Sequence, residues 1–276
     1  MRFSLYALAF CLFVTPAAAQ TYAWKADAPR ETLERRIAPP DGFVRESAQP
    51  GSFAAWLRGL PLKPVGAPVL LFNGATKPRQ DVHAAVIDID TGTRDLQQCA
   101  DAIMRLRAEW LYGNRRLGDI AFNYTSGARV DFARWSKGNR PSADGRNWSS
   151  GAKVDDSYAS FKRYMTQVFA YAGTYSLERE LKPVKPGTVP AIGDVFIKGG
   201  FPGHAVLVAD TARNPATGET RFLLIQSFMP AQDMHILKRP GTTDALPWYT
   251  ATADGSLQTP EWPFPPGSHK RWPAGN

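Results

Sequence analysis

The chain has 276 residues, of which 43% are hydrophobic and 21% charged, and these proportions are typical of a globular protein and exclude a disordered one. This length accommodates one large domain, or one domain with added segments. The formal net charge of +8 favours acidic partners, although the basic residues are scattered, so that a generally solvated basic surface explains the charge equally well.

The N-terminus has the pattern of a secretory signal peptide. Arg2 supplies a basic start, residues 5–14 form an apolar stretch, and Ala17, Ala18 and Ala19 provide a small-residue cleavage site. The apolar stretch is too short to cross a bilayer, and no later stretch approaches the roughly 20 apolar residues of a transmembrane helix. We therefore expect removal of residues 1–19 and a secreted, periplasmic protein without a transmembrane span. In that compartment peptidoglycan or another anionic envelope polymer is the expected partner, and nucleic acid is not.

Residues 20–68 are rich in proline and short apolar pieces, and are expected to wrap over the main domain. Within this segment Ser52 is the predicted cap of a short helix that Gly59 and Pro61 end. Residues 69–72 and 84–89 are predicted strands, the second because apolar residues alternate along it.

The clearest predicted helix begins at Asp95, with Asp95 and Gln98 forming a start similar to a capping box. Its apolar positions recur at helical spacing: Leu96, Cys99, Ile103, Leu106 and Trp110. This spacing turns Cys99 towards the core, whereas a first-turn thiol also meets the positive end of the helix dipole, which favours thiolate. Both interpretations of Cys99 stay open at this point.

The second half of the chain is predicted to be mostly strands. A strand at 120–125 and a helix beginning at Asp156 or Ser157 and ending at Gly173 come first. Strands then follow at 194–198, 205–209, 221–228 and 234–238. We assign residues 69–246 to the main domain. The tail, residues 247–276, is rich in tryptophan and proline and is expected to pack on that domain, with sugar stacking as the alternative.

The single cysteine outside the predicted signal peptide indicates a candidate catalytic site. Cys11 lies in the predicted signal peptide, which leaves Cys99 unpaired in an exported protein, where thiols usually pair or are absent. Cys99 is then a small buried hydrophobe, a partner in an intermolecular disulfide, or a nucleophile. His204 stands at the threshold of a predicted strand, and together the two residues suggest a Cys-His pair.

The order of a helix with cysteine, a second helix, a strand, a strand beginning with histidine and a strand with a polar residue resembles the papain-like NlpC/P60 amidases and peptidases of the cell wall. Gly193-Asp194 precedes the histidine strand, as in that family. The resemblance implies an α+β, papain-like fold in which helices pack on an antiparallel sheet. It also implies that Cys99 is the nucleophile, His204 the base, and a polar residue in 222–227 the group that orients the histidine; Gln226 is our choice. The chain departs from that family at 98–101, where Gln-Cys-Ala-Asp replaces Asp-Cys-Ser/Thr-Gly.

Four segments, 95–102, 193–197, 202–206 and 226–232, are more closely similar to a family of bacterial proteins described as domain of unknown function 4846. We expect a secreted cysteine-dependent hydrolase or acyltransferase that acts on an amide bond, with peptidoglycan as the candidate substrate. The backbone N–H of Cys99 and the amide of Gln97 or Gln98 are the expected oxyanion donors. The alternative is a non-catalytic envelope binding protein of the same fold, with Cys99 buried. No metal or other cofactor is expected, because no metal-binding histidine spacing and no nucleotide-binding glycine motif occur.

Overall fold

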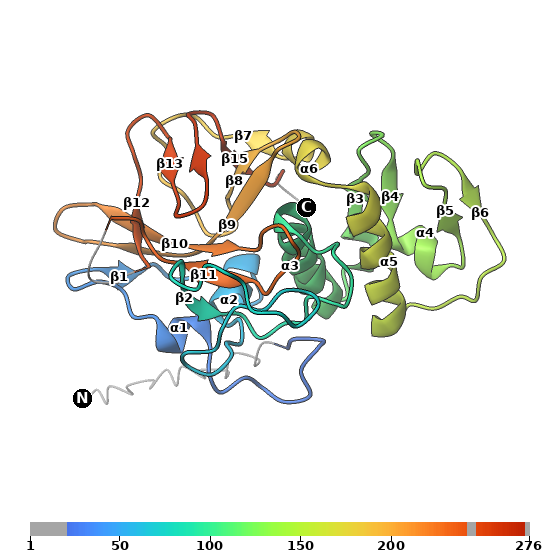
Figure 1. Cartoon of the computed structure of the whole chain (residues 1–276), viewed down its shortest axis with the longest axis horizontal. Coiled ribbons are helices and arrows are strands. Elements are labelled where there is room, and N and C mark those ends of the chain that lie inside the picture. Colours follow the sequence, from blue (N-terminus) through green and yellow to red (C-terminus); the bar gives the residue numbers. More distant parts are fainter. Residues whose placement is uncertain (1–20, 242–246, 274–276) are drawn as a thin grey trace, which may run out of the picture.

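The computed structural model of the chain describes residues 21–241 and 247–273, and the predicted signal peptide lies outside them. Figure 1 shows a mixed α+β molecule in which the sheet, with α3 against it, makes up one part, and α4, α5 and two small hairpins make up the opposite end. The expected α+β class, with helices and a large antiparallel sheet, is confirmed. No helix within the described ranges is both long and apolar enough to cross a membrane.

Among the described residues, nine strands form the main sheet in the order β2-β11-β10-β9-β8-β15-β7, with β1 paired to β9 and β12 paired to β10. All of these pairs are antiparallel. The strands are β1 (Val44–Arg45), β2 (His83–Val86), β7 (Lys182–Pro183), β8 (Val195–Lys198), β9 (His204–Arg213), β10 (Thr220–Gln226), β11 (His235–Leu237), β12 (Tyr249–Thr250) and β15 (His269–Arg271).

The remaining elements are short, apart from two helices. The helices are α1 (Leu33–Arg36), α2 (Phe53–Arg58), α3 (Cys99–Gly113), α4 (Phe132–Ser136), α5 (Tyr158–Tyr171) and α6 (Thr174–Glu180), with a 3-10 turn at Leu117–Asp119. Three hairpins stand apart from the main sheet: β3 (Ala121–Asn123) with β4 (Arg129–Asp131), β5 (Arg140–Pro141) with β6 (Trp148–Ser149), and β13 (Leu257–Gln258) with β14 (Pro263–Phe264).

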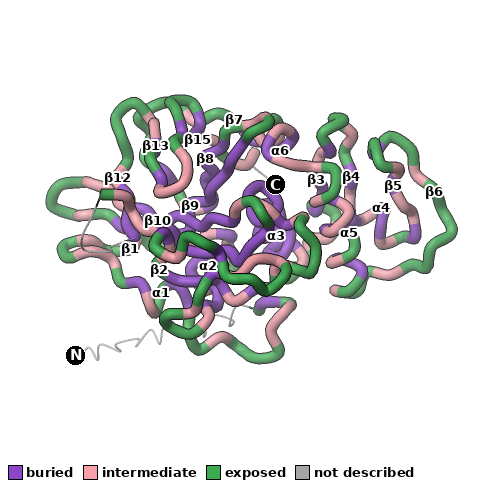
Figure 2. Tube along the Cα trace, in the orientation of Figure 1, coloured by how far each residue is buried: buried purple, intermediate pink, exposed green. Residues whose placement is uncertain are grey.

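Both faces of β9 are buried, which explains its nearly continuous run of small and apolar residues. Ala205 and Leu207 belong to the larger core, to which α2 and α3 contribute. Val206 and Val208 point to the other face, where Phe264 of the C-terminal segment covers them. The buried stretches at the centre of the molecule are visible in Figure 2. The sheet therefore lies between the helices and the tail.

The predicted start of the cysteine helix is wrong by several residues. The N–H groups of Leu96 and Gln98 each bond to a carbonyl only two residues back, so the chain is still turning there. The helix α3 begins at Cys99, with Gln98 as N-cap, and Asp101 accepts the backbone N–H of Gln98 at 3.1 Å. Asp95 lies before the helix and accepts the N–H of Ala231 at 2.7 Å. Cys99 is therefore the first residue of the helix.

Both ends of the described chain are fastened to the sheet. The N-terminal arm supplies β1, which pairs with the far end of β9, and α2, which packs against β9. The C-terminal segment supplies β12, beside β10, and β15, beside β8. Asp194 anchors β15, because it accepts hydrogen bonds from His269 at 2.7 Å and from Arg271 at 2.5 and 2.7 Å. Burial alone would raise the pKa of Asp194, but these bonds lower it below its usual range.

Candidate functional site

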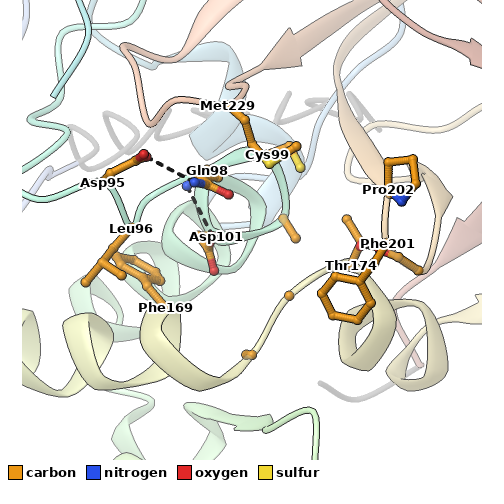
Figure 3. Close-up of a pocket in the computed structure, with 15 residues that line it drawn as sticks. Asp95, Leu96, Gln98, Cys99, Asp101, Phe169, Thr174, Phe201, Pro202 and Met229 are labelled. Carbon is orange, nitrogen blue, oxygen red and sulfur yellow. Dashed lines mark hydrogen bonds between the residues drawn. The ribbon is translucent and has the colours of Figure 1, made fainter.

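A cavity of about 300 Å³ opens at the N-terminus of α3, and Cys99 lines it. Figure 3 shows how four parts of the chain surround this cavity: the start of α3, the end of α5 with its turn into α6, the loop between β8 and β9, and Met229 after β10. The first N–H groups of a helix have no intrahelical partners, so the cavity borders free backbone donors. A polar or electron-rich group that enters it meets both the thiol and these donors.

The thiol of Cys99 is buried, with only 5% of the residue exposed. The backbone N–H groups of Ala100 and Ala205 donate towards Sγ. Ala205 is free to do so because of the strand register: Leu207 pairs with Ile225, so Ala205 faces Ser227, one residue beyond the end of β10. The sulfur therefore lies at the point where β10 leaves β9.

Of the two interpretations of Cys99, burial favours the neutral thiol over the thiolate. Burial raises the pKa of Cys99 to about 12, and the charge of Asp101 acts in the same direction. The backbone donors lower this pKa, but by less than desolvation raises it. Burial also raises the pKa of Asp101 well above its usual range, and its Oδ1 has no hydrogen-bond partner. Cys99 thus rests as a neutral thiol.

His204 is the first residue of β9, and its ring lies among Phe228, Trp262 and Phe264, with ring centroids 4.7, 5.5 and 5.7 Å away. Its Nε2 is 2.9 Å from Oε1 of Gln226, so the structure brings these two predicted residues together. Burial lowers the pKa of His204 to about 4, although the bond to Gln226 acts in the opposite direction. The imidazole is therefore neutral at neutral pH.

Hydrogen bonds on the other side of Gln226 decide which ring nitrogen of His204 carries the proton. Nδ1 of His235 lies 2.9 Å from the carbonyl oxygen of Asp233 and must donate to it, which leaves Nε2 of His235 as an acceptor. Gln226 Nε2 lies 3.4 Å from that acceptor and donates at 2.7 Å to Oε2 of Glu261. Oε1 of Gln226 then faces His204 and accepts the proton on its Nε2. Nδ1 of His204 keeps its lone pair.

Glu261 is part of this site, and sequence reasoning missed it. Its Oε1 accepts the ammonium of Lys77 at 2.7 Å, and the two side chains are only 9% and 6% exposed. The Lys77 ammonium also lies 5.3 Å from the centre of the Phe228 ring. The only available signal was an acidic residue between Pro260 and Trp262, in a tail expected to pack on the sheet. Burial of such a residue requires a partner, but the pattern does not say which one.

Cys99 and His204 are joined indirectly. In the part of the chain that the structure describes, no hydrogen bond links their side chains, and Nδ1 of His204 has no hydrogen-bond partner. The connection runs through Ala205, which follows His204 and directs its N–H at the sulfur. The thiol thus contacts the backbone next to His204, whereas the His204 ring lies with Trp262 and Phe264 on the side of the sheet that the tail covers. The structure does not bring the side chains of Cys99 and His204 into contact.

The side chains named as oxyanion donors are engaged elsewhere. Gln97 accepts a hydrogen bond from Arg105 at 3.0 Å and donates to the carbonyl of Asp90, inside the core. Gln98 lines the cavity, and its amide donates to Asp95 at 3.0 Å. The backbone N–H groups at the start of α3 are thus the donors best placed beside the thiol. Over residues 21–241 and 247–273, no three His, Cys, Asp or Glu side chains form a group able to hold a metal ion.

Comparison with known proteins gives one match. The model of the family described as Domain of unknown function (4846) matches residues 33–271, which covers α1 to β15 and all residues of the site. No curated protein and no solved structure matches the chain.

Proposed function

We propose that this chain, which belongs to the family described as Domain of unknown function (4846), is a secreted cysteine-dependent hydrolase or acyltransferase that acts on an amide bond. The scaffold is papain-like in our proposal: a helix with a cysteine at its N-terminus packs on an antiparallel sheet, and the histidine begins a neighbouring strand. The family description names no activity, so the proposal depends on the site. The observation that carries it is that Cys99 lines a cavity at the N-terminus of α3 and receives the N–H of Ala205, the residue after His204, whose Nε2 is bonded to Gln226.

The proposed reaction starts from a neutral thiol and a neutral imidazole. For this reaction Nδ1 of His204 has to come within reach of Sγ, where it takes the proton of Cys99 as Sγ attacks the substrate carbonyl, so the thiolate forms only during attack. The new C–S bond forms, the C–N bond breaks, and the imidazolium returns the proton to the leaving amine. Water or a second amine then cleaves the thioester, which distinguishes a hydrolase from an acyltransferase.

Two further groups have roles in this mechanism. Gln226 orients the ring, as the third member of a catalytic triad does, but as a neutral amide it stabilises the imidazolium less than a carboxylate would. The backbone N–H of Cys99 stabilises the negative charge that develops on the carbonyl oxygen, since the N–H of Ala100 is directed at Sγ. Peptidoglycan is the candidate substrate because of the predicted export and the net charge of +8, and a periplasmic location follows from the same signal pattern.

One observation favours the alternative of a non-catalytic envelope binding protein. Cys99 is buried and its pKa is raised to about 12, as expected of a cysteine that serves only as a small core residue. The two functions differ in what His204 does: a base must receive the thiol proton, whereas a core histidine has no effect on the reactivity of Cys99.

Acylation of Cys99 by a small activated ester, p-nitrophenyl acetate, tests this difference. With neutral His204 as the base, the rate of Cys99 acylation, followed by nitrophenolate release and by intact mass, stays nearly constant from about pH 6 to pH 8. In His204→Ala the acylation rate is lower than in the wild type. It also rises about tenfold for each unit of increase in pH, because the reaction then depends on the small fraction of free thiolate. Cys99→Ser controls for acylation at other sites. Coincident profiles for the wild type and His204→Ala would leave the binding protein as the better account.

A further inference from the structure

The charge of the cavity differs from that of the whole chain. The chain has a formal net charge of +8, yet the residues described as lining the cavity include Asp95 and Asp101 and no lysine, arginine or histidine. An anionic group that entered would meet the carboxylate of Asp95 without a basic partner, and this juxtaposition of like charges is unfavourable. The site therefore disfavours a carboxylate or phosphate next to the thiol.

The rim of the cavity is apolar. Phe201 is 86% exposed and Met229 is 47% exposed, although both are large hydrophobic residues, and they come from two different loops around Cys99 (Figure 3). Leu96, Phe169 and Ala172 continue this apolar surface along the wall. Large apolar side chains that gather in the open around a cavity are typical of a binding surface.

The volume of the cavity limits what it binds. A cavity of about 300 Å³ is at the small end of ligand sites, and it accommodates one amino-acid-sized group rather than a polymer segment.

We propose that this cavity binds the acyl side of the substrate, and that the group before the scissile carbonyl is a residue with an apolar side chain, without negative charge. Phe201 and Met229 then hold the side chain. The covalent step rests on the proposed function, but the binding preference does not require it.

Binding to the full chain with Cys99→Ala tests the preference without the reaction. Three matched probes differ in one side chain: the N-acetyl amides of phenylalanine, glutamate and lysine, with affinity measured by NMR titration. We expect the phenylalanine probe to bind most tightly and the glutamate probe at least about tenfold more weakly, a difference of roughly 1.4 kcal/mol. Asp95→Asn should improve binding of the glutamate probe alone, because it removes a repulsive charge at the mouth.

Surface variants locate the binding. Phe201→Ser and Met229→Ser should each weaken the phenylalanine probe about threefold to tenfold, whereas Val65→Ser, which changes a residue 83% exposed and outside the cavity, should not. Equal affinity for the glutamate and phenylalanine probes, insensitivity to Phe201→Ser and Met229→Ser, or no binding of any probe would each overturn the inference. The expected preference together with coincident acylation profiles for the wild type and His204→Ala would instead remove only the proposed catalysis.

Discussion

At the scale of single residues, the orientation of one amide determines the chemistry of His204. Gln226 presents its oxygen to His204 because Glu261 and His235 occupy both of its N–H groups. Without these two fixed partners, the side-chain amide of Gln226 would flip by about 180° at little cost. Its NH₂ group would then donate to His204, where its oxygen now accepts. The proton on His204 would move to Nδ1, and the ring would lose its capacity to accept the thiol proton there.

Glu261→Gln tests this positioning role. A glutamine at 261 both donates and accepts, so it no longer fixes the Gln226 amide, and we expect a mixture of the two neutral forms of His204 in ¹⁵N NMR spectra. The rate of Cys99 acylation should fall about tenfold, or roughly 1.4 kcal/mol. Glu178→Gln is the matched control, since Glu178 is also paired with a lysine, Lys270 at 3.8 Å, away from the network. An unchanged His204 spectrum in Glu261→Gln would exclude the role.

At the scale of elements, the β8 to β9 loop sets both the cavity wall and the start of the histidine strand. Gly203 immediately precedes His204 and lines the cavity. A Cβ at this position would come within 2.3 Å of Oγ1 of Thr174, 2.6 Å of the Gly200 oxygen and 2.7 Å of the Lys198 oxygen. Two of these atoms belong to the backbone, so a side chain here displaces the loop itself.

Gly203→Ala should therefore damage both stability and site. We expect a loss of about 1–3 kcal/mol in the free energy of unfolding, measured with urea, and slower Cys99 acylation in the protein that stays folded. Gly118→Ala provides the comparison, because a Cβ at Gly118 meets nothing within 4 Å. A Gly203→Ala protein with the stability and acylation rate of the wild type would contradict this account of the loop.

At the scale of the whole molecule, burial of titratable side chains links stability to pH. Burial lowers the pKa of His235 to about 3, far below that of an exposed histidine, so the unfolded chain binds a proton in mild acid that the folded chain does not. This histidine therefore contributes less to stability as pH falls below about 6.5. Glu180 acts in the opposite sense, because burial raises its pKa to about 7 and the folded chain binds the proton first.

Differences between wild type and variants separate these two effects. His235→Gln should destabilise the protein at neutral pH, and this deficit relative to the wild type should shrink by roughly 1 kcal/mol per unit as pH falls from about 6 to 4. Glu180→Gln should show a deficit that grows over the range from about pH 7 to 5, since the wild type gains from protonation there. Urea unfolding across pH measures both. A deficit of His235→Gln that is constant with pH would contradict a neutral buried imidazole.

Local patterns in the sequence determined much of this architecture. The helix predicted to begin at Asp156 or Ser157 is α5, which Ser157 caps by accepting the N–H of Ser160, a bond between neighbouring residues. The strands at 194–198 and 205–209 correspond to β8 and β9, with β9 continuing to Arg213. Gln226 was chosen as the polar residue that the family resemblance implies, and its side chain lies on the His204 side of the sheet.

Only the tertiary structure decided the protonation state of Cys99 and the hydrogen-bond partners of Gln226 and Glu261. The helix dipole is a local property and favours a thiolate at Cys99, but desolvation depends on everything packed around the sulfur, and it is the larger effect. Lys77 and Glu261 are 184 residues apart, and Glu261 lies 35 residues from Gln226, so no spacing along the chain connects them. The sheet and the returning tail bring them together, because a buried charge requires a partner and a folded chain can supply one from any distance in sequence.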